Sequence, residues 1–252
     1  MPIIIKNSTE IAKMQAAGKL AAEVLIYLKP FVQIGISTLE LNNLAHEFIV
    51  KHGGIPAPLN YHGFPKSICT SVNNVICHGI PSAKEILKAG DIVNLDVTVI
   101  KDGYHGDTSQ TFLVGEVAEN IKNLVKRTER AMWEGISVVK PGADFAEIGK
   151  AIEKYLHKFN YGIVREYTGH GIGKNFHEDP YVLHYINSEK LPKMQEGMIF
   201  TIEPMVNLSP RYQTVLDPKD HWTVRTKDSA VSAQFEHTVL VTKDGVEVLT
   251  QI

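Results

Sequence analysis

The chain has 252 residues, enough for one large domain or two small ones with a buried core. Hydrophobic residues make up 44% of it and charged residues 21%, which excludes a disordered, collagen-like or coiled-coil protein. The formal net charge of -2 argues against binding to nucleic acid or to anionic lipid, so partners have to be inferred from a specific site.

The amino terminus and the apolar segments indicate neither export nor membrane insertion. The first residues are too weakly basic for a secretory signal, and the longest apolar runs fall far short of the roughly 20 residues of a membrane-spanning helix. We therefore expect a cytoplasmic protein. The two cysteines, Cys69 and Cys77, are expected on neighbouring strands as free buried thiols rather than as a disulfide or a metal-binding pair.

The first half of the chain begins with two segments in which apolar residues have the spacing of a helix. The apolar spacing predicts a long helix over residues 10–28 and a second helix that runs to about His52. Ser37 and Glu40 have the spacing of a capping box, so we expect the second helix to begin there.

A hairpin with two carboxylates on one face follows these helices. Residues 92–100 are rich in β-branched residues and predict a strand, which a two-residue turn at Asp102 and Gly103 connects to a second strand ending near Val114. In this register residue 96 pairs with 109 and residue 98 with 107. Asp96 and Asp107 therefore become diagonal neighbours on one face of the sheet.

The same order of elements recurs 107 residues later. Helices are expected over residues 120–138 and from a second capping box, Asp144 with Glu147, to about Asn160. The shift also places the apolar run 198–202, which ends at Glu203, on the strand that carries Asp96. We predict an α+β fold with halves over 10–114 and 119–252, related by a pseudo-twofold axis within a single domain of residues 1–252.

The rest of the second half contributes a loop and one more acidic strand. Residues 207–221 contain two prolines and several charges, and we interpret them as an inserted surface loop. The apolar run 233–241 is expected to form one strand, and Glu236 interrupts it.

Four carboxylates in core-like strands predict a cation site. Singly, each would be interpreted as a charge on an edge strand, but Asp96, Asp107, Glu203 and Glu236 together would be costly to bury without counter-charge. Two divalent cations would neutralise them, and His170, in a glycine-flanked loop, would add an imidazole ligand. Such a ligand set suits Mn, Fe, Co or Zn.

Seven short motifs also give the chain a resemblance to a known family. The matching segments are residues 77–81, 94–96, 106–109, 169–173, 177–180, 200–204 and 234–238, which read CHGIP, NLD, GDTS, GHGIG, HEDP, FTIEP and QFEHT. In this combination and order the chain resembles the type I methionine aminopeptidases of the pita-bread metallopeptidase superfamily over essentially its whole length. The bacterial type, without an amino-terminal extension, is expected.

The resemblance implies a fold and a ligand set. It implies a pita-bread fold, with helices packed outside a mainly antiparallel sheet. It also implies two divalent metal ions, with Asp107 and Glu236 bridging them. The implied ligands are Asp96, Asp107, His170, Glu203 and Glu236.

The same resemblance implies catalytic roles. Glu203 would move a proton from the attacking water to the leaving amine, His78 would lie near the scissile amide nitrogen, and His177 near the carbonyl oxygen. From the residues alone, a single loop histidine is usually a surface residue. No chemistry is assigned to five other histidines, and two are left undecided. The five are His46, His52, His157, His184 and His221, and the two are His62 and His105.

The resemblance further implies a pocket for the methionine side chain, formed by residues that would otherwise be interpreted as core. These are Tyr61, Phe64, Cys69, Phe176 and Trp222, with Pro58 at the rim. Because the loop of residues 207–221 leads into Trp222, it affects one wall of this pocket. A monovalent cation, Na or K, is implied at the backbone carbonyls of Asn73, Val75 and Ser232.

The expected function is removal of the N-terminal methionine from nascent proteins and peptides, preferably when the second residue is small. The expected partners are such peptides and nascent chains, with a transient ribosome contact. We expect a monomer that binds no nucleic acid and no membrane.

Two alternatives are weighed. One is a proline-directed aminopeptidase or prolidase of the same fold, although such relatives generally carry a sizeable amino-terminal domain and the helical pattern here begins at Glu10. The other is a metal-free binding module, which the retention of all five ligands and both histidines disfavours.

Overall fold

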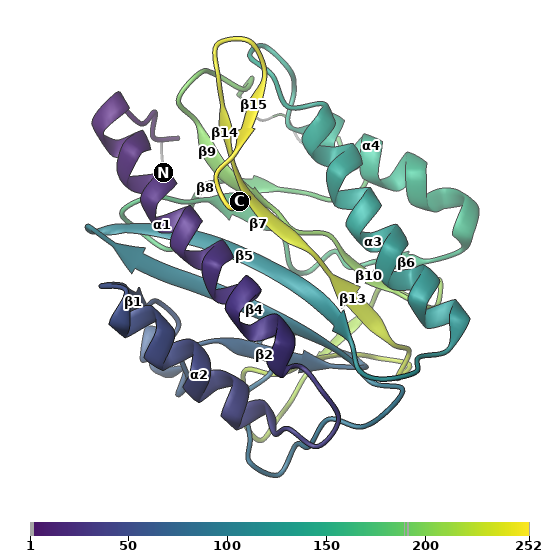
Figure 1. The fold of residues 1–252 in the computed structure, drawn as a ribbon. Helices are drawn as coiled ribbons and strands as arrows, with labels where there is room; N and C mark the ends of the chain where they lie inside the picture. The colour runs from purple at the N-terminus through teal and green to yellow at the C-terminus, as the bar shows by residue number, and fades with distance from the viewer. Residues whose placement is uncertain (1–2, 189, 191, 252) are drawn as a thin grey trace.

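A curled antiparallel sheet with helices packed on its outer face forms the body of the molecule (Figure 1). The computed structural model describes residues 3–188, 190 and 192–251. Within this part of the chain, four helices of more than one turn are present. They are α1 (Ser8–Leu28), α2 (Thr38–Lys51), α3 (Glu119–Ser137) and α4 (Ala146–Leu156).

The central sheet runs in the order β1-β4-β5-β14-β9-β7-β8, with β2 paired to β4 and β15 paired to β14. Two three-stranded sheets, β13-β10-β6 and β11-β12-β3, flank it. The strands are β1 (Ile55–Pro56), β2 (Cys69–Val72), β3 (Val75–Cys77), β4 (Ile92–Lys101), β5 (Tyr104–Leu113), β6 (Gly162–Ile163), β7 (Gly169–Gly171), β8 (Glu178–Val182), β9 (Ile199–Ile202), β10 (Met205–Asn207), β11 (Thr214–Leu216), β12 (Val224–Thr226), β13 (Ser232–Gln234), β14 (Glu236–Val241) and β15 (Val246–Val248).

The two halves of the chain meet between β5 and β14. On one side β4 and β5 pack against α1, and on the other β9 and β13 pack against α3 (Figure 1). The order β4-β5-β14-β9 is therefore symmetric about the β5–β14 boundary, as the internal repeat predicts. The predicted α+β architecture with two related halves is confirmed.

Alternation along β4 separates the core from the opposite face of the sheet. Leu95, Val97 and Val99 are fully buried in the cluster beneath α1 and α2, so Asp96 and Thr98 project to the other side. An equivalent cluster lies beneath α3 and α4 and includes Phe200 and Val239. The helices thus leave the inner face of the sheet free for polar side chains.

The register of the β4–β5 hairpin agrees with the sequence-based prediction. Asp96 pairs with Ser109 and Thr98 with Asp107. The capping box at α2 is also present, because the Ser37 hydroxyl accepts from the Glu40 amide and the Glu40 carboxylate accepts from the Ser37 amide. Both features depend on local geometry alone.

The second predicted capping box is wrong. Helix α4 begins at Ala146, and no side chain caps it. The Asp144 carboxylate instead accepts from Lys193 at 3.4 Å, and the Glu147 carboxylate accepts from Lys150 at 2.7 Å. A turn in which the Glu147 amide donates to the Asp144 carbonyl precedes the helix and delays its start.

Two predictions about the later strands also need correction. The run 233–241 is not one strand, because β13 ends at Gln234 and β14 begins at Glu236 in a different sheet. The Gln234 carbonyl accepts from the side chains of Asn94 and Thr111, while Gln234 itself pairs with Met205 of β10. The segment 207–221 is not wholly a loop, since β11 lies within it and pairs with β12.

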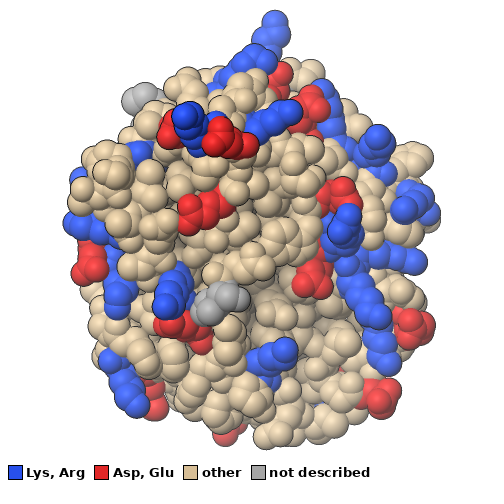
Figure 2. All heavy atoms as spheres, turned by 45° about the horizontal axis from the view of Figure 1, so that its top comes forward, with Lys and Arg blue, Asp and Glu red and all other residues tan. Residues whose placement is uncertain are grey.

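Charges are dispersed over the surface. Figure 2 shows acidic and basic side chains interspersed around one face, with a largely uncharged region near its centre. Among the described residues, no helix combines the length and the apolar character that a bilayer crossing requires.

Close packing of α1 on β5 gives a stability prediction. A methyl group at Gly106 would overlap the backbone of Ala17 and Gly18, so Gly106→Ala should lower the free energy of unfolding by about 3 kcal/mol in urea titrations. Gly245→Ala is the matched control, because nothing lies within 4 Å of its added methyl, and it should change stability by less than about 0.5 kcal/mol. Equal midpoints for the two variants would contradict this account of the packing.

Candidate active site

A cavity of about 360 Å³ opens on the inner face of the sheet. It is lined by all the residues that sequence analysis assigns to divalent metal binding, catalysis and the side-chain pocket. These are Pro58, Tyr61, Phe64, Cys69, His78, Asp96, Asp107, His170, Phe176, His177, Glu203, Trp222 and Glu236. The fold thus collects residues that lie up to 178 positions apart in the chain into one chamber.

Four adjacent strands supply the carboxylates. Asp96 comes from β4, Asp107 from β5, Glu236 from the first position of β14, and Glu203 from the position directly after β9. These are the four strands about the symmetric boundary, so each half of the chain contributes two carboxylates. His170 lies in β7, next to β9, and not on a loop as the sequence analysis expects.

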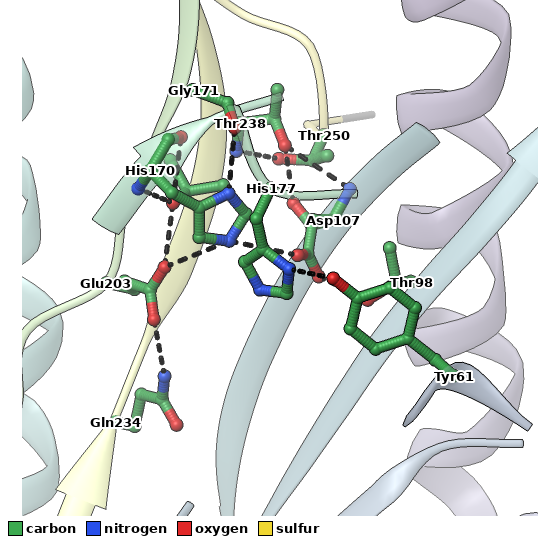
Figure 3. Close-up of polar contacts among 11 residues, drawn as sticks. Tyr61, Thr98, Asp107, His170, Gly171, His177, Glu203, Gln234, Thr238 and Thr250 are labelled. Atoms are coloured by element: carbon green, nitrogen blue, oxygen red, sulfur yellow. Dashed lines mark hydrogen bonds and ion pairs between the residues drawn. The ribbon is translucent and has the colours of Figure 1, made fainter. Parts of the chain in front are cut away.

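The imidazole of His170 lies between two of the carboxylates (Figure 3). Its Nε2 is 3.8 Å from Asp107 Oδ2 and 3.7 Å from Glu203 Oε1. Ligand atoms of Asp107, His170 and Glu236 all lie within 4.8 Å of one another. These separations exceed a hydrogen bond and leave room for a cation between the groups.

Burial sets the electrostatics of the cluster. It raises the pKa of Asp96 to about 7 and the pKa values of Asp107, Glu203 and Glu236 well above their ordinary range, and mutual repulsion adds to the last three. Burial lowers the pKa of His170 to about 3, so the ring is neutral at pH 7. No lysine or arginine lines this cavity in the described part of the chain.

The donor set fits divalent metal ions. It offers carboxylate oxygens and one neutral imidazole, the ligands that borderline divalent cations prefer. The Gln234 side-chain oxygen, buried at the cavity wall, has no hydrogen-bond partner among the described residues, as expected where a ligand completes the polar contacts.

Neighbouring polar groups fix the orientation of these donors. Thr98 donates to Asp107 Oδ1 and Thr201 donates to Glu203 Oε1, each at 2.7 Å (Figure 3). The Nδ1 of His170 bonds to the Gly171 carbonyl at 3.0 Å, which makes Nδ1 the protonated nitrogen and turns the Nε2 lone pair toward the carboxylates.

Two further histidines line the cavity beside this cluster. Desolvation by the surrounding cavity wall lowers the pKa of both His78, which is half-buried, and His177, whose ring keeps an exposed edge, to about 4, so both rings are neutral near pH 7. His177 Nδ1 is hydrogen-bonded to the Tyr61 hydroxyl at 2.8 Å (Figure 3). The His177 ring also stacks on Phe176. His78 has a positive φ of 56°, a strained backbone conformation that is concentrated at functional sites.

The apolar end of the cavity is formed by rings and a thiol. Phe64 packs edge-on to Trp222 with ring centres 5.2 Å apart, and Tyr61 packs on Phe176. Cys69 and Cys77 are free and buried, as predicted, and burial raises the pKa of both thiols, which keeps them uncharged.

The residues predicted for a monovalent cation lie outside this cavity. Asn73 and Ser232 are adjacent, because the Ser232 amide donates to the Asn73 carbonyl at 2.8 Å. Asn73 and Val75 line a separate surface depression.

Sequence reasoning missed several contributors to the cavity. His184, to which no role was assigned, is buried, and its Nε2 accepts from the backbone amide of Glu203. Gln234 belongs to a matched motif but was given no role, and Tyr167 lines the wall near His78. Of the undecided histidines, His105 stacks on Phe176 from outside the cavity. Only tertiary contacts reveal these positions.

A curled sheet that encloses a buried cluster of acidic residues and an imidazole defines a metal-dependent peptidase of the pita-bread fold. The chain belongs to metallopeptidase family M24, whose model matches residues 12–243. A methionine aminopeptidase from Rickettsia prowazekii is 54% identical over 250 residues, which cover 99% of this chain and 96% of that protein. One from Escherichia coli K12 is 49% identical over 251 residues, 99% of this chain and 94% of that protein.

Solved structures agree with this assignment. A methionine aminopeptidase structure from Rickettsia prowazekii has a TM-score of 0.96 at 53% identity, covering 99% of this chain and all of that one. A prolidase from Pyrococcus furiosus has a TM-score of 0.77 at 21% identity, covering 99% of this chain and 66% of that one. At this lower identity, the prolidase shares the fold alone.

The acidic cluster predicts how the metal-free protein responds to pH. A carboxylate whose pKa is raised on folding stabilises the fold fully below its ordinary value, 3.8 for Asp96, and this stability is lost as pH rises through about 7. The buried histidines have lowered pKa values, and their stabilisation is complete above about 6.5. Above pH 7 the histidine contribution is therefore constant while the remaining carboxylate contribution is lost, so between pH 7 and 9 the melting temperature without metal should fall.

Thermal unfolding in EDTA and in excess Mn²⁺ measures this effect. Mn²⁺ should abolish the fall, and Asp107→Asn should reduce it without metal because one buried charge is removed. A melting temperature that rises between pH 7 and 9 in EDTA would show that the carboxylates are not mutually repulsive.

Proposed function

We propose that this protein is a metal-dependent aminopeptidase that removes the N-terminal methionine from peptides and nascent proteins, preferably when the second residue is small. The observation that carries the proposal is the cavity itself, where an acidic cluster adjoins an apolar pocket. The relatives that are 54% and 49% identical over almost the whole chain are named methionine aminopeptidases, which supports the same substrate. The prolidases share only the fold, so the proline-directed alternative is disfavoured.

Asp96, Asp107, His170, Glu203 and Glu236 would hold two divalent ions drawn from Co, Mn, Fe and Zn. Four carboxylates balance two divalent charges, and Asp107 and Glu236, on the two adjacent central strands, are the proposed bridging ligands. When bound, such ions lower the pKa of a coordinated water towards about 7 and polarise the substrate carbonyl.

Glu203 is the proposed proton carrier. Its Oε1 accepts from Thr201 at 2.7 Å, whereas its Oε2 has only a 3.4 Å contact with the Gln234 amide. The Oε2 atom is thus the freer oxygen to accept a proton from the attacking water and pass it to the leaving amine. Because Thr201 and the His184 contact fix the residue, the transfer needs no large movement.

The two neutral histidines would bind the reacting amide. With the Tyr61 hydroxyl donating to Nδ1 of His177, the Nε2–H of that ring is the donor for the developing oxyanion. His78 would orient the scissile nitrogen. Desolvation lowers the pKa of both rings to about 4, so at neutral pH they are uncharged and do not repel the cations.

The apolar end of the cavity would bind the methionine side chain. Tyr61, Phe64, Cys69, Phe176 and Trp222, with Pro58 at the rim, offer rings and a neutral thiol. Burying a methionine side chain contributes about 1.5–3 kcal/mol. Sulfur–aromatic contacts add about 0.3–1.5 kcal/mol.

Further proposals concern properties that the cavity does not address. We propose a monomer of a single domain that acts in the cytoplasm and contacts the ribosome transiently. We also propose a Na or K ion at the backbone carbonyls of Asn73, Val75 and Ser232, supported by the adjacency of Asn73 and Ser232.

The substrate assignment is tested with two peptides. Metal-free protein is given Mn²⁺, Co²⁺, Fe²⁺ or Zn²⁺ in turn, and the amino acids released from Met-Ala-Ser and Ala-Pro-Ser are quantified. We expect methionine release with at least one metal and none in EDTA. Release of alanine from Ala-Pro-Ser without methionine from Met-Ala-Ser would instead identify a proline-directed peptidase, and inactivity on both would favour a binding module.

The catalytic roles are tested by substitution. Glu203→Gln and His78→Ala should each lower kcat by about 10²–10⁴-fold because each removes a proton donor or acceptor at the reacting bond. Circular dichroism should show that both variants are folded. His157→Ala, at an exposed position, is the control and should keep wild-type turnover. Wild-type turnover in Glu203→Gln or His78→Ala would disprove the corresponding role.

A further inference from the structure

A buried ion pair joins the amino-terminal segment to the start of β8 in the second half. Lys6 Nζ lies 2.6 Å from Glu178 Oε2, and each side chain is only 3% exposed. The two residues are 172 positions apart in the sequence. Neither lines the cavity, and neither has a role in the proposed reaction.

Each partner of this pair is also held by other contacts. Lys6 Nζ donates to the Ile4 carbonyl at 3.3 Å, and Glu178 Oε1 accepts from the Asn175 amide at 3.2 Å. A methyl group at Gly173 would lie 2.7 Å from Glu178 Oε1 and 2.8 Å from Lys6 Cε. Residues 173–178 therefore pack closely against the ion pair.

The backbone on both sides is fixed as well. The Lys6 amide donates to the Gly197 carbonyl at 2.8 Å, in the turn that precedes β9. Asn7, the next residue, caps α1 through a capping box with Glu10. The backbone at Lys6 is therefore held on both sides by hydrogen bonds, and its side chain does not project from an unattached chain end.

A buried ion pair is weak evidence for a stabilising role. The desolvation of two charges offsets most of their attraction, and well-packed apolar residues often stabilise a fold as well or better. What the pair does provide is a short contact of defined geometry. The neighbouring pair between Lys174 and Glu10, at 3.8 Å with Lys174 68% exposed, provides no such constraint.

The segment fixed by this pair carries two residues of the cavity. Phe176 and His177 line it, and their rings stack with centres 4.5 Å apart and an angle of 12°. Glu178 follows His177 directly and begins β8, and its side chain lies outside the cavity in the ion pair with Lys6, whereas His177 lines the cavity. Because the two residues are adjacent in the chain, the ion pair that holds Glu178 outside the cavity also restricts the position of the His177 ring inside it.

We propose that Lys6 is a positioning residue for His177, acting through its ion pair with Glu178. This inference rests on the proposed function, in which His177 binds the developing oxyanion. The Tyr61 hydroxyl holds Nδ1 of the His177 ring from within the cavity, and the Lys6–Glu178 pair holds the adjacent backbone from outside the cavity. A donor that must meet a transition-state oxygen is sensitive to displacements of about 1 Å, which cost up to about 10²-fold in rate.

The test is a double-mutant cycle measured on Met-Ala-Ser with the metal-loaded enzyme. The proteins are wild type, Lys6→Met, His177→Ala and Lys6→Met/His177→Ala, with Lys174→Met as the control for a lost charge in the same segment. Lys6→Met should lower kcat by about 10–100-fold with KM changed less than about threefold, because a transition-state contact is displaced. Metal content should be unchanged, and Lys174→Met should behave as wild type.

The decisive readout is the coupling between the two sites. In the His177→Ala background, Lys6→Met should lower kcat by less than about twofold, since the residue through which it acts is gone. A full 10–100-fold loss in that background, or wild-type kcat for Lys6→Met, overturns the inference. Should Lys6→Met fail to fold, the nearly isosteric Glu178→Gln replaces it in the same cycle with the same criteria.

Methionine release by the wild-type protein distinguishes failure of the proposed function from failure of this inference. A wild-type protein that does not release methionine overturns the proposed function and this inference with it. A wild-type protein that releases methionine, with no coupling between positions 6 and 177, overturns this inference alone.

Discussion

The clustering of four carboxylates, three of them buried and one half-buried, is the constraint on which the rest of the structure depends. Asp96, Asp107, Glu203 and Glu236 converge without a lysine or arginine at the wall of the described cavity, and burial raises the pKa of each. Bound cations neutralise such a cluster at neutral pH, whereas without them burial favours the protonated carboxyls. The threonines that donate to it and the neutral imidazole beside it are then understood as parts of a metal-binding shell.

Much of the fold and the site could be predicted because the decisive signals are local. The register that brings Asp96 and Asp107 together follows from one two-residue turn, and the internal repeat places Glu203 opposite Asp96. What could not be predicted depends on contacts between distant segments. The strand break at Phe235 depends on the side chains of Asn94 and Thr111, which donate to the Gln234 carbonyl. Nothing in the sequence around His184 indicates that its ring accepts from the Glu203 amide.

The second capping box shows the limit of local rules. Asp144 and Glu147 have the correct spacing, yet each finds a lysine partner and leaves the helix uncapped. In the first box Ser37 and Glu40 instead bond to each other on a partly buried turn. A motif of two polar residues therefore predicts a cap only where the surroundings offer no competing charge.

The symmetric placement of the carboxylates has a consequence for how such a protein could arise. Each half supplies two of the four acids, one from an inner strand and one from the strand beside it, and the halves meet at β5 and β14. A chain of one half would carry an incomplete set and an open sheet edge. It could complete both only by pairing with a second copy of itself, so the present molecule has the layout of a fused homodimer whose binding site lay on the axis.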